Sequence, residues 1–312
     1  MYSRKIIHVF ATSMIHYLIP VYNVEGKDFP AVSITGSKCK LMCKHCYARI
    51  LQRMKPAETP SELVEFGRKI RERGYRGLLV SGGSDEKGRV PFEDYVDAIK
   101  ELKKIGLKVF IHTGLVDEQR AKLLKKAGVD MVLYDIVSSQ EAIRKILNLN
   151  CSPKDYWKGL KHLVEHKVPV APHIVVGLNE GKPSEELKSV NIVASTGCNA
   201  LVIVVFTPYP GTPLENAQPP PVNYILKVME YARRKISAPM SLGCMRPRQI
   251  REIEYKAVDL GFNGIAFPSQ DALNYITSKN IKYEIHHECC ASIAYHSKYT
   301  KAPQAPKLSP VP

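Results

Sequence analysis

The stretch AVSITGSKCKLMCKHCY, residues 31–47, decides the interpretation of this chain. Its first six residues form an apolar run that is typical of a buried strand. Three cysteines follow directly, Cys39, Cys43 and Cys46, with the spacing C-x3-C-x2-C. Thiolates this close together can hold three irons of a [4Fe–4S] cluster, whose irons are normally bound by cysteine. No fourth protein ligand follows nearby in the sequence, so one iron is left open to chelate a small molecule.

A structural zinc site is the competing interpretation of the same loop. Zinc takes four nitrogen or sulfur ligands in a tetrahedron. His45 could be recruited, but Cys46 beside it competes for the same geometry, and no second C-x2-C pair follows at zinc-finger spacing. The cluster interpretation is therefore favoured.

Short apolar runs alternate with longer amphipathic segments from residue 31 to about residue 285. Such alternation predicts parallel βα units, and eight units close a barrel. We therefore predict an α/β fold, a (β/α)8 TIM-type barrel, although seven strands with a gap or a six-stranded open barrel would give a similar pattern. Chemistry in such barrels lies at the carboxyl ends of the strands, where the cysteine loop falls. The eight runs are 31–36, 77–83, 107–114, 129–136, 168–177, 199–206, 239–243 and 263–268.

The two ends of the chain differ from the barrel region. Residues 1–30 are predicted to form an N-terminal helical segment, since polar residues interrupt their uncharged part too often for a membrane span or a signal peptide. The barrel is assigned to residues 31–285, a cysteine-containing extension to 286–296, and a disordered tail rich in Lys and Pro to 297–312. The eight cysteines cluster unevenly, which favours metal or redox use in a reducing compartment and predicts a cytoplasmic protein.

The formal net charge of +15 predicts attraction to polyanions. Lys and Arg are spread along many predicted helices instead of forming the concentrated basic face that nucleic acids require. The charge therefore favours docking of an acidic carrier protein and argues against nucleic acid, and an RNA-modifying enzyme stays an alternative that a steep salt dependence of RNA binding would revive.

The cysteine loop, together with the run SGG (81–83) at the end of the second predicted strand, resembles the radical SAM superfamily and, within it, the biotin synthase-like group. The resemblance implies that S-adenosylmethionine binds the open iron of the cluster held by Cys39, Cys43 and Cys46. An electron from the cluster would then release a 5′-deoxyadenosyl radical, which is cofactor-borne chemistry.

Further positions match motifs of that superfamily by their order and their places at strand ends. Gly82 and Gly83 correspond to the turn that receives the methionyl amino group. HIVVGLNE (173–180) resembles the fifth-strand motif near adenine, and FTPYPGTPLE (206–215) resembles the loop after the sixth strand. His45 stands where the family usually has an aromatic residue that stacks near adenine. The residues that the resemblance assigns to cofactor binding are His45, Gly82, Gly83, Asp135, Val175, Gly177 and Glu180.

Four of the remaining cysteines are candidates for a second cluster. Cys244 follows the seventh predicted strand in GCMRPR, and Cys289 and Cys290 form a vicinal pair in HHECC. Cys151 is assigned to the same face of the barrel because the next predicted helix must run from that face to the opposite one before the fifth strand. Cys198 lies at the opposite end of the barrel and is interpreted as structural. An auxiliary [4Fe–4S] cluster on Cys151, Cys244, Cys289 and Cys290 is the hypothesis, with a three-cysteine site lacking Cys151 as its alternative.

A second cluster beside a radical generator suggests that the cluster is sacrificed to donate sulfur. The GCMRP segment and the C-terminal CC resemble the two-component lipoyl synthases of archaea and some bacteria. That resemblance implies sulfur insertion at carbon 8 or carbon 6 of an octanoyl chain on a lipoyl-carrier domain, together with a paralogous partner synthase and an electron donor such as ferredoxin. Biotin synthase itself is rejected, because the second, third and fifth predicted strands carry no cysteine for its [2Fe–2S] cluster.

The alternatives within the superfamily are enzymes that resemble hydrogenase maturases or methylornithine synthase, which would not need the four extra thiols. A non-catalytic zinc-binding barrel is a further alternative. Iron content separates these, since two [4Fe–4S] clusters give about eight irons per chain and one gives about four.

Overall fold

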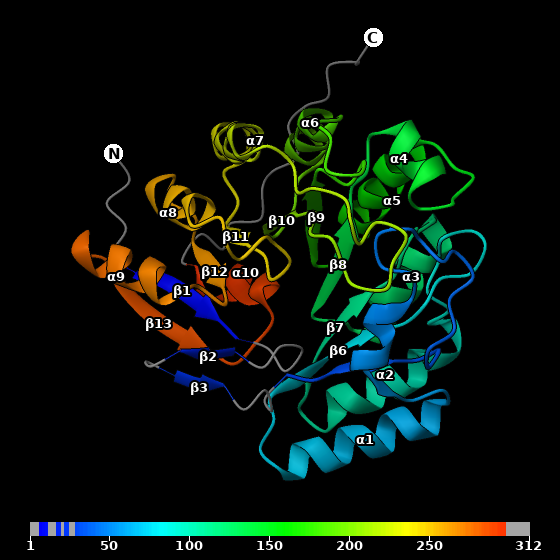
Figure 1. The fold of residues 1–312 in the computed structure, drawn as a ribbon. Coiled ribbons are helices and arrows are strands. Elements are labelled where there is room, and N and C mark those ends of the chain that lie inside the picture. The colour runs from blue at the N-terminus through cyan, green and yellow to red at the C-terminus, as the bar shows by residue number, and fades with distance from the viewer. Residues whose placement is uncertain (1–5, 12–16, 20–21, 25–28, 298–312) are drawn as a thin grey trace.

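The computed structural model describes residues 6–11, 17–19, 22–24 and 29–297. Within them the main sheet has eleven strands in the order β13-β1-β12-β11-β10-β9-β8-β7-β6-β4-β5, and it curls into a half-barrel (Figure 1). Its strands are β1 (Ile6–Phe10), β4 (Ala31–Ser33), β5 (Lys55–Pro56), β6 (Gly77–Ser81), β7 (Lys108–His112), β8 (Met131–Asp135), β9 (Val170–Val176), β10 (Leu201–Val205), β11 (Met240–Leu242), β12 (Gly264–Ala266) and β13 (Lys282–His286).

Nine helices alternate with these strands on the outer side of the curled sheet, and α10 (Ile293–His296) lies on its inner side (Figure 1). This count refers to the ranges that the structure describes. The nine are α1 (Pro60–Glu72), α2 (Val96–Lys104), α3 (Glu118–Ala127), α4 (Gln140–Lys145), α5 (Pro153–Glu165), α6 (Glu186–Thr196), α7 (Val222–Lys235), α8 (Glu252–Asp259) and α9 (Gln270–Ser278). Three 3-10 helices are η1 (Arg49–Arg53), η2 (Glu93–Tyr95) and η3 (Cys290–Ser292).

The strands of the main sheet are parallel, and the helices that join them cover its outer face while side chains fill its inner face. All five residues of β6 and of β10 are buried, which is the pattern expected for strands covered on both faces. Each of the eight predicted runs contains one observed strand. The prediction of a TIM-type α/β fold is therefore confirmed. The hydrogen-bonded order has two ends, at β5 and at β13, so the sheet curls without closing.

The prediction of an N-terminal helix is wrong for the described residues. Ile6–Phe10 form β1, which pairs in parallel with both β12 and β13. A separate antiparallel pair follows, β2 (Tyr17–Ile19) and β3 (Tyr22–Val24). The sequence IIHVF favours a strand because it is rich in β-branched residues. It lacks charge because Ile7, Val9 and Phe10 are almost fully buried in the sheet.

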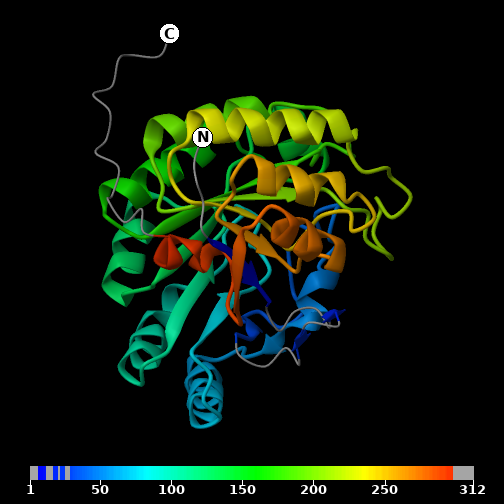
Figure 2. The ribbon, with the colours of Figure 1, turned by 90° about the vertical axis from the view of Figure 1, so that its left-hand side faces the viewer.

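The C-terminal extension, predicted as residues 286–296, begins at the last residue of β13 and enters the half-barrel. After β13 the chain turns inward, and η3 contacts β8, β10, β11 and β12. Figure 2 shows this red segment beside the blue strand β1. The rest of the predicted tail, 298–312, lies outside the described residues. Among the helices that the structure describes, none combines the length and the apolar character needed to cross a bilayer.

Candidate functional site

The three loop cysteines line a cavity of about 180 Å³ at the carboxyl ends of the first strands. Cys39, Cys43 and Cys46 all follow β4, the strand that the sequence places before them. Side chains and backbone from β6, β7, β8 and α5 complete the wall. Besides the cysteines, the lining residues include His45, Gly82, Gly83, Ser84, His112, Gly114, Leu133, Asp135, Leu147, Leu149 and Tyr156.

The cysteine loop is held from one side by the segment that follows α4. Lys44 N donates to Ile146 O at 2.8 Å. The Asn148 side chain donates to Leu41 O at 2.9 Å and to Met42 O at 3.0 Å. Asn148 itself has a φ of 53°, a left-handed conformation that asparagine tolerates better than most residues. These bonds fix the backbone on both sides of Cys43.

The other side of the loop rests on the Gly-rich turn after β6. Gly83 N donates to the Thr35 hydroxyl at 2.7 Å, and Ser84 N donates to Cys39 Sγ at 3.4 Å. A Cβ atom on Gly83 would lie 2.0 Å from Lys38 O and 2.6 Å from the Cβ of Cys39. Only glycine allows this approach, so the turn and the loop form one wall of the cavity.

The electrostatics of the loop make a thiolate available at Cys46. A hydrogen bond between Cys43 and Cys46 lowers the pKa of Cys46 and raises that of Cys43. Burial opposes protonation of His45, but Cys46 and Asp135 raise its pKa above the ordinary value. Because the thiolate is the form that binds metal, the lowered pKa favours Cys46 as a metal ligand.

A group of polar side chains inside the half-barrel was missed by the sequence analysis. His112, from β7, lines the cavity, and its ring centroid lies 5.8 Å from that of His173 on β9. Burial lowers the pKa of His112 and lowers that of His173 to about 4, with His112 adding to the latter shift. The charge of Asp135 partly opposes both shifts, because it raises the pKa of each ring.

The predicted cofactor residues fall into two groups in the structure. His45, Gly82, Gly83 and Asp135 line the cavity beside the cysteines. Val175 lies in a neighbouring space between β9 and α6, packed against the same hydrophobic cluster as the loop.

The two remaining predicted cofactor positions have structural partners outside this cavity. Gly177 has a φ of 78° and donates its N–H to Glu186 at 2.8 Å. Glu180 pairs with Lys182 at 3.1 Å near the surface. Their assignment to cofactor binding stays a prediction.

The proposed auxiliary cysteines are divided in the same way. Cys244, just after β11, interacts with Cys289 and Cys290 at the start of η3. Burial raises the pKa of Cys244, and Cys289 raises it further. A hydrogen bond with Cys289 raises the pKa of Cys290, to which Cys244 adds. The structure thus brings together three thiols from two distant parts of the chain.

Cys151 lies in a different place from these three thiols, so the four-cysteine set is corrected to three. It packs against the same smaller hydrophobic cluster as Cys39 and Cys46 do, and burial raises its pKa to about 11. The reason is local, since Ser152 and Asp155 cap the start of α5 and hold the preceding residue there. Cys198 is buried in the main core, as expected of a structural residue.

The cavity residues fit an iron–sulfur cluster that also binds a small molecule. Three thiols line the cavity, and no fourth cysteine is among its described lining residues. The Nδ1 atom of His45 is buried without a partner in the described part of the chain, so a polar ligand could satisfy it. The loop thiols do not converge tightly enough to hold one ion, whereas a cluster spreads its ligands over separate irons.

A TIM-type half-barrel with three cysteines at the carboxyl ends of its strands defines a class of radical enzymes, and comparison with known proteins agrees. The family model of the Radical SAM superfamily matches residues 33–189. The chain belongs to this superfamily, for which a [4Fe–4S] cluster with S-adenosylmethionine is implied. Curated proteins that it resembles include biotin synthases, which supports the predicted resemblance to the biotin synthase-like group.

The similarity to individual relatives is partial. Biotin synthase of Leptospira biflexa is 31% identical over 143 residues, covering 44% of this chain and 38% of that protein. Biotin synthase of Rickettsia felis is 25% identical over 197 residues, covering 60% of this chain and 62% of that protein. The match therefore spans between 38% and 62% of the length of these two relatives.

Two solved structures support the fold. The [FeFe]-hydrogenase maturase HydG has a TM-score of 0.60 and 15% identity, over 94% of this chain and 66% of that one. Methylornithine synthase PylB has a TM-score of 0.56 and 16% identity, over 87% of this chain and 86% of that one. At this identity the likeness concerns the fold alone.

Proposed function

We propose that this chain is a radical SAM enzyme that inserts sulfur at an unactivated carbon, acting as one component of a two-protein lipoyl synthase. Its substrate would be an octanoyl chain attached to a lysine of a lipoyl-carrier domain, with sulfur added at carbon 8 or carbon 6. The observation that carries the proposal is the second group of thiols inside the same half-barrel as the cysteine loop, the partly buried Cys244 and the buried Cys289 and Cys290.

Different residues would have different roles in the cavity beside the cysteine loop. Cys39, Cys43 and Cys46 would hold three irons of the cluster. The backbone at Gly83 lies against the loop and would let a ligand approach closely, since no side chain intervenes. The unpartnered Nδ1 atom of His45 would accept a hydrogen bond from that ligand or donate one to it.

Bound in this cavity, the cluster and S-adenosylmethionine would supply one-electron chemistry and a 5′-deoxyadenosyl radical able to remove hydrogen from an alkyl carbon. Acid–base groups alone could not activate such a carbon. Asp135, His112 and His173 would orient polar parts of the bound molecules from inside the half-barrel.

Cys244, Cys289 and Cys290 would hold the auxiliary cluster that is sacrificed as the sulfur source. Three cysteines would bind three irons of this cluster, so the fourth iron would need a ligand from outside this thiol group. Lipoyl-carrier domains are commonly acidic, so the net charge of +15 supports their docking. A paralogous synthase for the second carbon and a reductant such as ferredoxin complete the proposed partners.

The test is anaerobic incubation of the cluster-loaded protein with reductant, S-adenosylmethionine and an octanoyl-lysine peptide. Mass spectrometry should detect sulfur added to the peptide, and 5′-deoxyadenosine should accumulate with it. Release of 5′-deoxyadenosine without added sulfur, in the presence of both cysteine groups and the partner synthase, would contradict the sulfur-insertion role.

Two variants separate this proposal from its nearest alternative. Cys43→Ala should abolish 5′-deoxyadenosine formation and sulfur insertion together. Cys244→Ala should abolish sulfur insertion while 5′-deoxyadenosine formation remains. A biotin synthase-like enzyme with another reaction, resembling the hydrogenase maturases or methylornithine synthase, would contain about four irons instead of about eight.

A further inference from the structure

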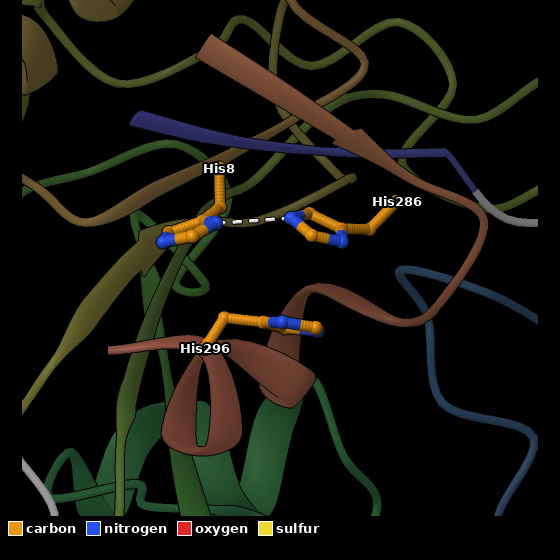
Figure 3. Close-up of side chains that lie close together, drawn as sticks. All are labelled: His8, His286 and His296. Atoms are coloured by element: carbon orange, nitrogen blue, oxygen red, sulfur yellow. Dashed lines mark hydrogen bonds between the residues drawn. The ribbon is translucent and has the colours of Figure 1, made fainter. Parts of the chain in front are cut away.

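Three histidines from distant parts of the chain meet where the two ends of the described chain pack together. His8 lies on β1, His286 ends β13, and His296 ends α10. Figure 3 shows the three imidazoles facing one another from the two strands and the helix. This group is separate from the cysteine loop and from the three auxiliary thiols.

The geometry of the trio suits a single bound ion. One ligand nitrogen from each histidine lies within 4.8 Å of the other two. His8 Nδ1 and His286 Nε2 are 2.9 Å apart. In tetrahedral zinc sites the Zn–N distance is about 2.0–2.1 Å, so two nitrogens on one ion lie roughly 3.4 Å apart. Small rotations of the side chains would open the space for a metal.

A carboxylate is placed to complete the coordination. Glu284 Oε2 lies 3.7 Å from His8 Nδ1 and 3.9 Å from His286 Nε2, so it faces the same two nitrogens. On the far side, Glu288 Oε2 lies 3.3 Å from His296 Nε2, and Glu288 Oε1 accepts from Lys108 at 3.1 Å. Carboxylates beside ligating histidines orient the rings and raise their basicity.

Burial favours the neutral, metal-binding state at two of the three imidazoles, those of His8 and His286. Burial first, and then the charge of His296, lower the pKa of His8, which Glu284 only partly opposes. Burial, with His296 and His8, lowers the pKa of His286 to about 4. Neutral imidazole is the ligand form for zinc and related ions.

We propose that His8, His286 and His296 bind one divalent transition-metal ion, with Zn²⁺ as the reference ion and Glu284 as the fourth ligand. Imidazole and carboxylate together suit zinc and the first-row metals near it. The ion would join α10 to β1 and β13, which are neighbours in the sheet but the first and last strands along the described chain. It would thereby clip the C-terminal segment that carries Cys289 and Cys290 into the half-barrel.

The three imidazoles are partly exposed: 11% of the His8 side chain, 17% of that of His286 and 24% of that of His296 is accessible to solvent. A cavity of about 200 Å³ is lined by Arg76, Ile285, His286, His287 and Glu288. The Glu284 side chain is 53% exposed. An ion could therefore enter without unfolding the protein, and exchange in the folded state can be measured.

The experiment uses the full chain with its iron–sulfur clusters loaded, so that iron occupies the cysteines. After incubation with ZnSO₄ and desalting, elemental analysis should find about one zinc per chain, and X-ray absorption at the zinc edge should show nitrogen and oxygen neighbours at about 2.0–2.1 Å. Less than about 0.1 zinc per chain, or sulfur neighbours around the zinc, would overturn the proposal.

Two histidine variants test the ligand set. His8→Gln and His296→Gln should each lower zinc affinity by at least about tenfold, since losing even a residue that only supports a ligand costs about that much. His287→Gln changes the adjacent, exposed histidine outside the trio and should retain zinc. Unchanged zinc binding in both ligand variants would reject the assignment.

Exposed Glu284 provides a variant that need not disturb folding. Glu284→Gln should weaken zinc binding by about tenfold or more with an unchanged circular dichroism spectrum. Zinc should also raise the melting temperature of the unaltered chain, because a ligand that binds only the folded state stabilises it. A zinc-dependent rise of equal size in His8→Gln would count against the site.

Discussion

Gly83 and Cys39 lie so close that a Cβ atom on the glycine would come within 2.6 Å of the cysteine Cβ. The same atom would lie 2.0 Å from the carbonyl of Lys38. Two segments that are far apart in the sequence, the turn after β6 and the loop after β4, therefore meet through bare backbone. The position of Cys39 therefore depends on the absence of a side chain at Gly83, in the turn after β6.

Gly83→Ala should displace the cysteine loop. The added methyl group collides with backbone that cannot rotate away, so Cys39 must move. A displacement of about 1 Å at a reacting centre can lower rates roughly 100-fold, and we expect a loss of that order in 5′-deoxyadenosine formation. Gly74→Ala is the control, because a Cβ there meets nothing within 4 Å although its φ is +84°. Gly74→Ala should lower the stability of the fold without changing the rate of 5′-deoxyadenosine formation.

Asn148→Ala should loosen the cysteine loop from the opposite side. The variant loses two side-chain hydrogen bonds to the loop carbonyls, each worth about 0.5–1.5 kcal/mol. It also places alanine at a φ of 53°. We expect a loss of about 2–3 kcal/mol in unfolding free energy, measured by urea denaturation, and weaker iron retention.

A matched variant separates the hydrogen bonds of Asn148 from its backbone strain. Asn280 has a φ of 56° but lies in the turn before β13, far along the chain from the loop. Asn280→Ala should therefore cost about 1 kcal/mol from strain alone and leave iron content unchanged. Equal iron loss in both variants would show that the contacts of Asn148 do not hold the loop.

Cys151→Ala and Cys244→Ala should differ in iron content. Cys244 interacts with Cys289 and Cys290, whereas Cys151 packs against the same hydrophobic cluster as the loop cysteines. After anaerobic reconstitution we expect Cys244→Ala and Cys290→Ala to lose about four of about eight irons, and Cys151→Ala to keep them. Unchanged iron in both Cys244→Ala and Cys290→Ala would refute an auxiliary cluster at these thiols.

Arg246→Ala should destabilise the segment that carries Cys244. Arg246 is 2% exposed, pairs with Glu254, and donates to Gly243 O and Ala266 O, each at 2.7 Å. Removing one partner of a buried pair costs about 3–5 kcal/mol, because the other charge remains buried. Thermal or urea unfolding measures the loss.

The exposed pair of Lys69 and Glu65 is the control for Arg246. Lys69→Ala should cost no more than about 1 kcal/mol, since solvent screens surface ion pairs. A similar small loss in Arg246→Ala would mean that the loop before α8 does not depend on the buried pair.

The sequence alone was sufficient for the repeating part of the fold. The eight apolar runs are local signals, and each run contains an observed strand. The order of cysteine loop and first strand also placed the loop on the catalytic edge, because parallel strands present their carboxyl ends together. Local periodicity determines these features before any long-range contact forms.

Tertiary structure decided the conformation and the pairing of the segments near the two ends of the chain. Ile6–Phe10 form a strand only because β12 and β13 stand on either side of them, and these partners come from the far end of the chain. In isolation the segment gives no sign of its pairing register. The inference of a helix failed because an uncharged stretch is equally compatible with burial in a sheet.

The sequence by itself determined which chemistry the chain can carry, since three thiols in one short loop stay together in any fold. Tertiary structure decided which distant groups join. It separated Cys151 from Cys244 and gathered His8, His286 and His296. The physical reason is that spacing along the chain constrains only near neighbours, whereas contacts between remote segments depend on how the whole sheet curls and on what fills its interior.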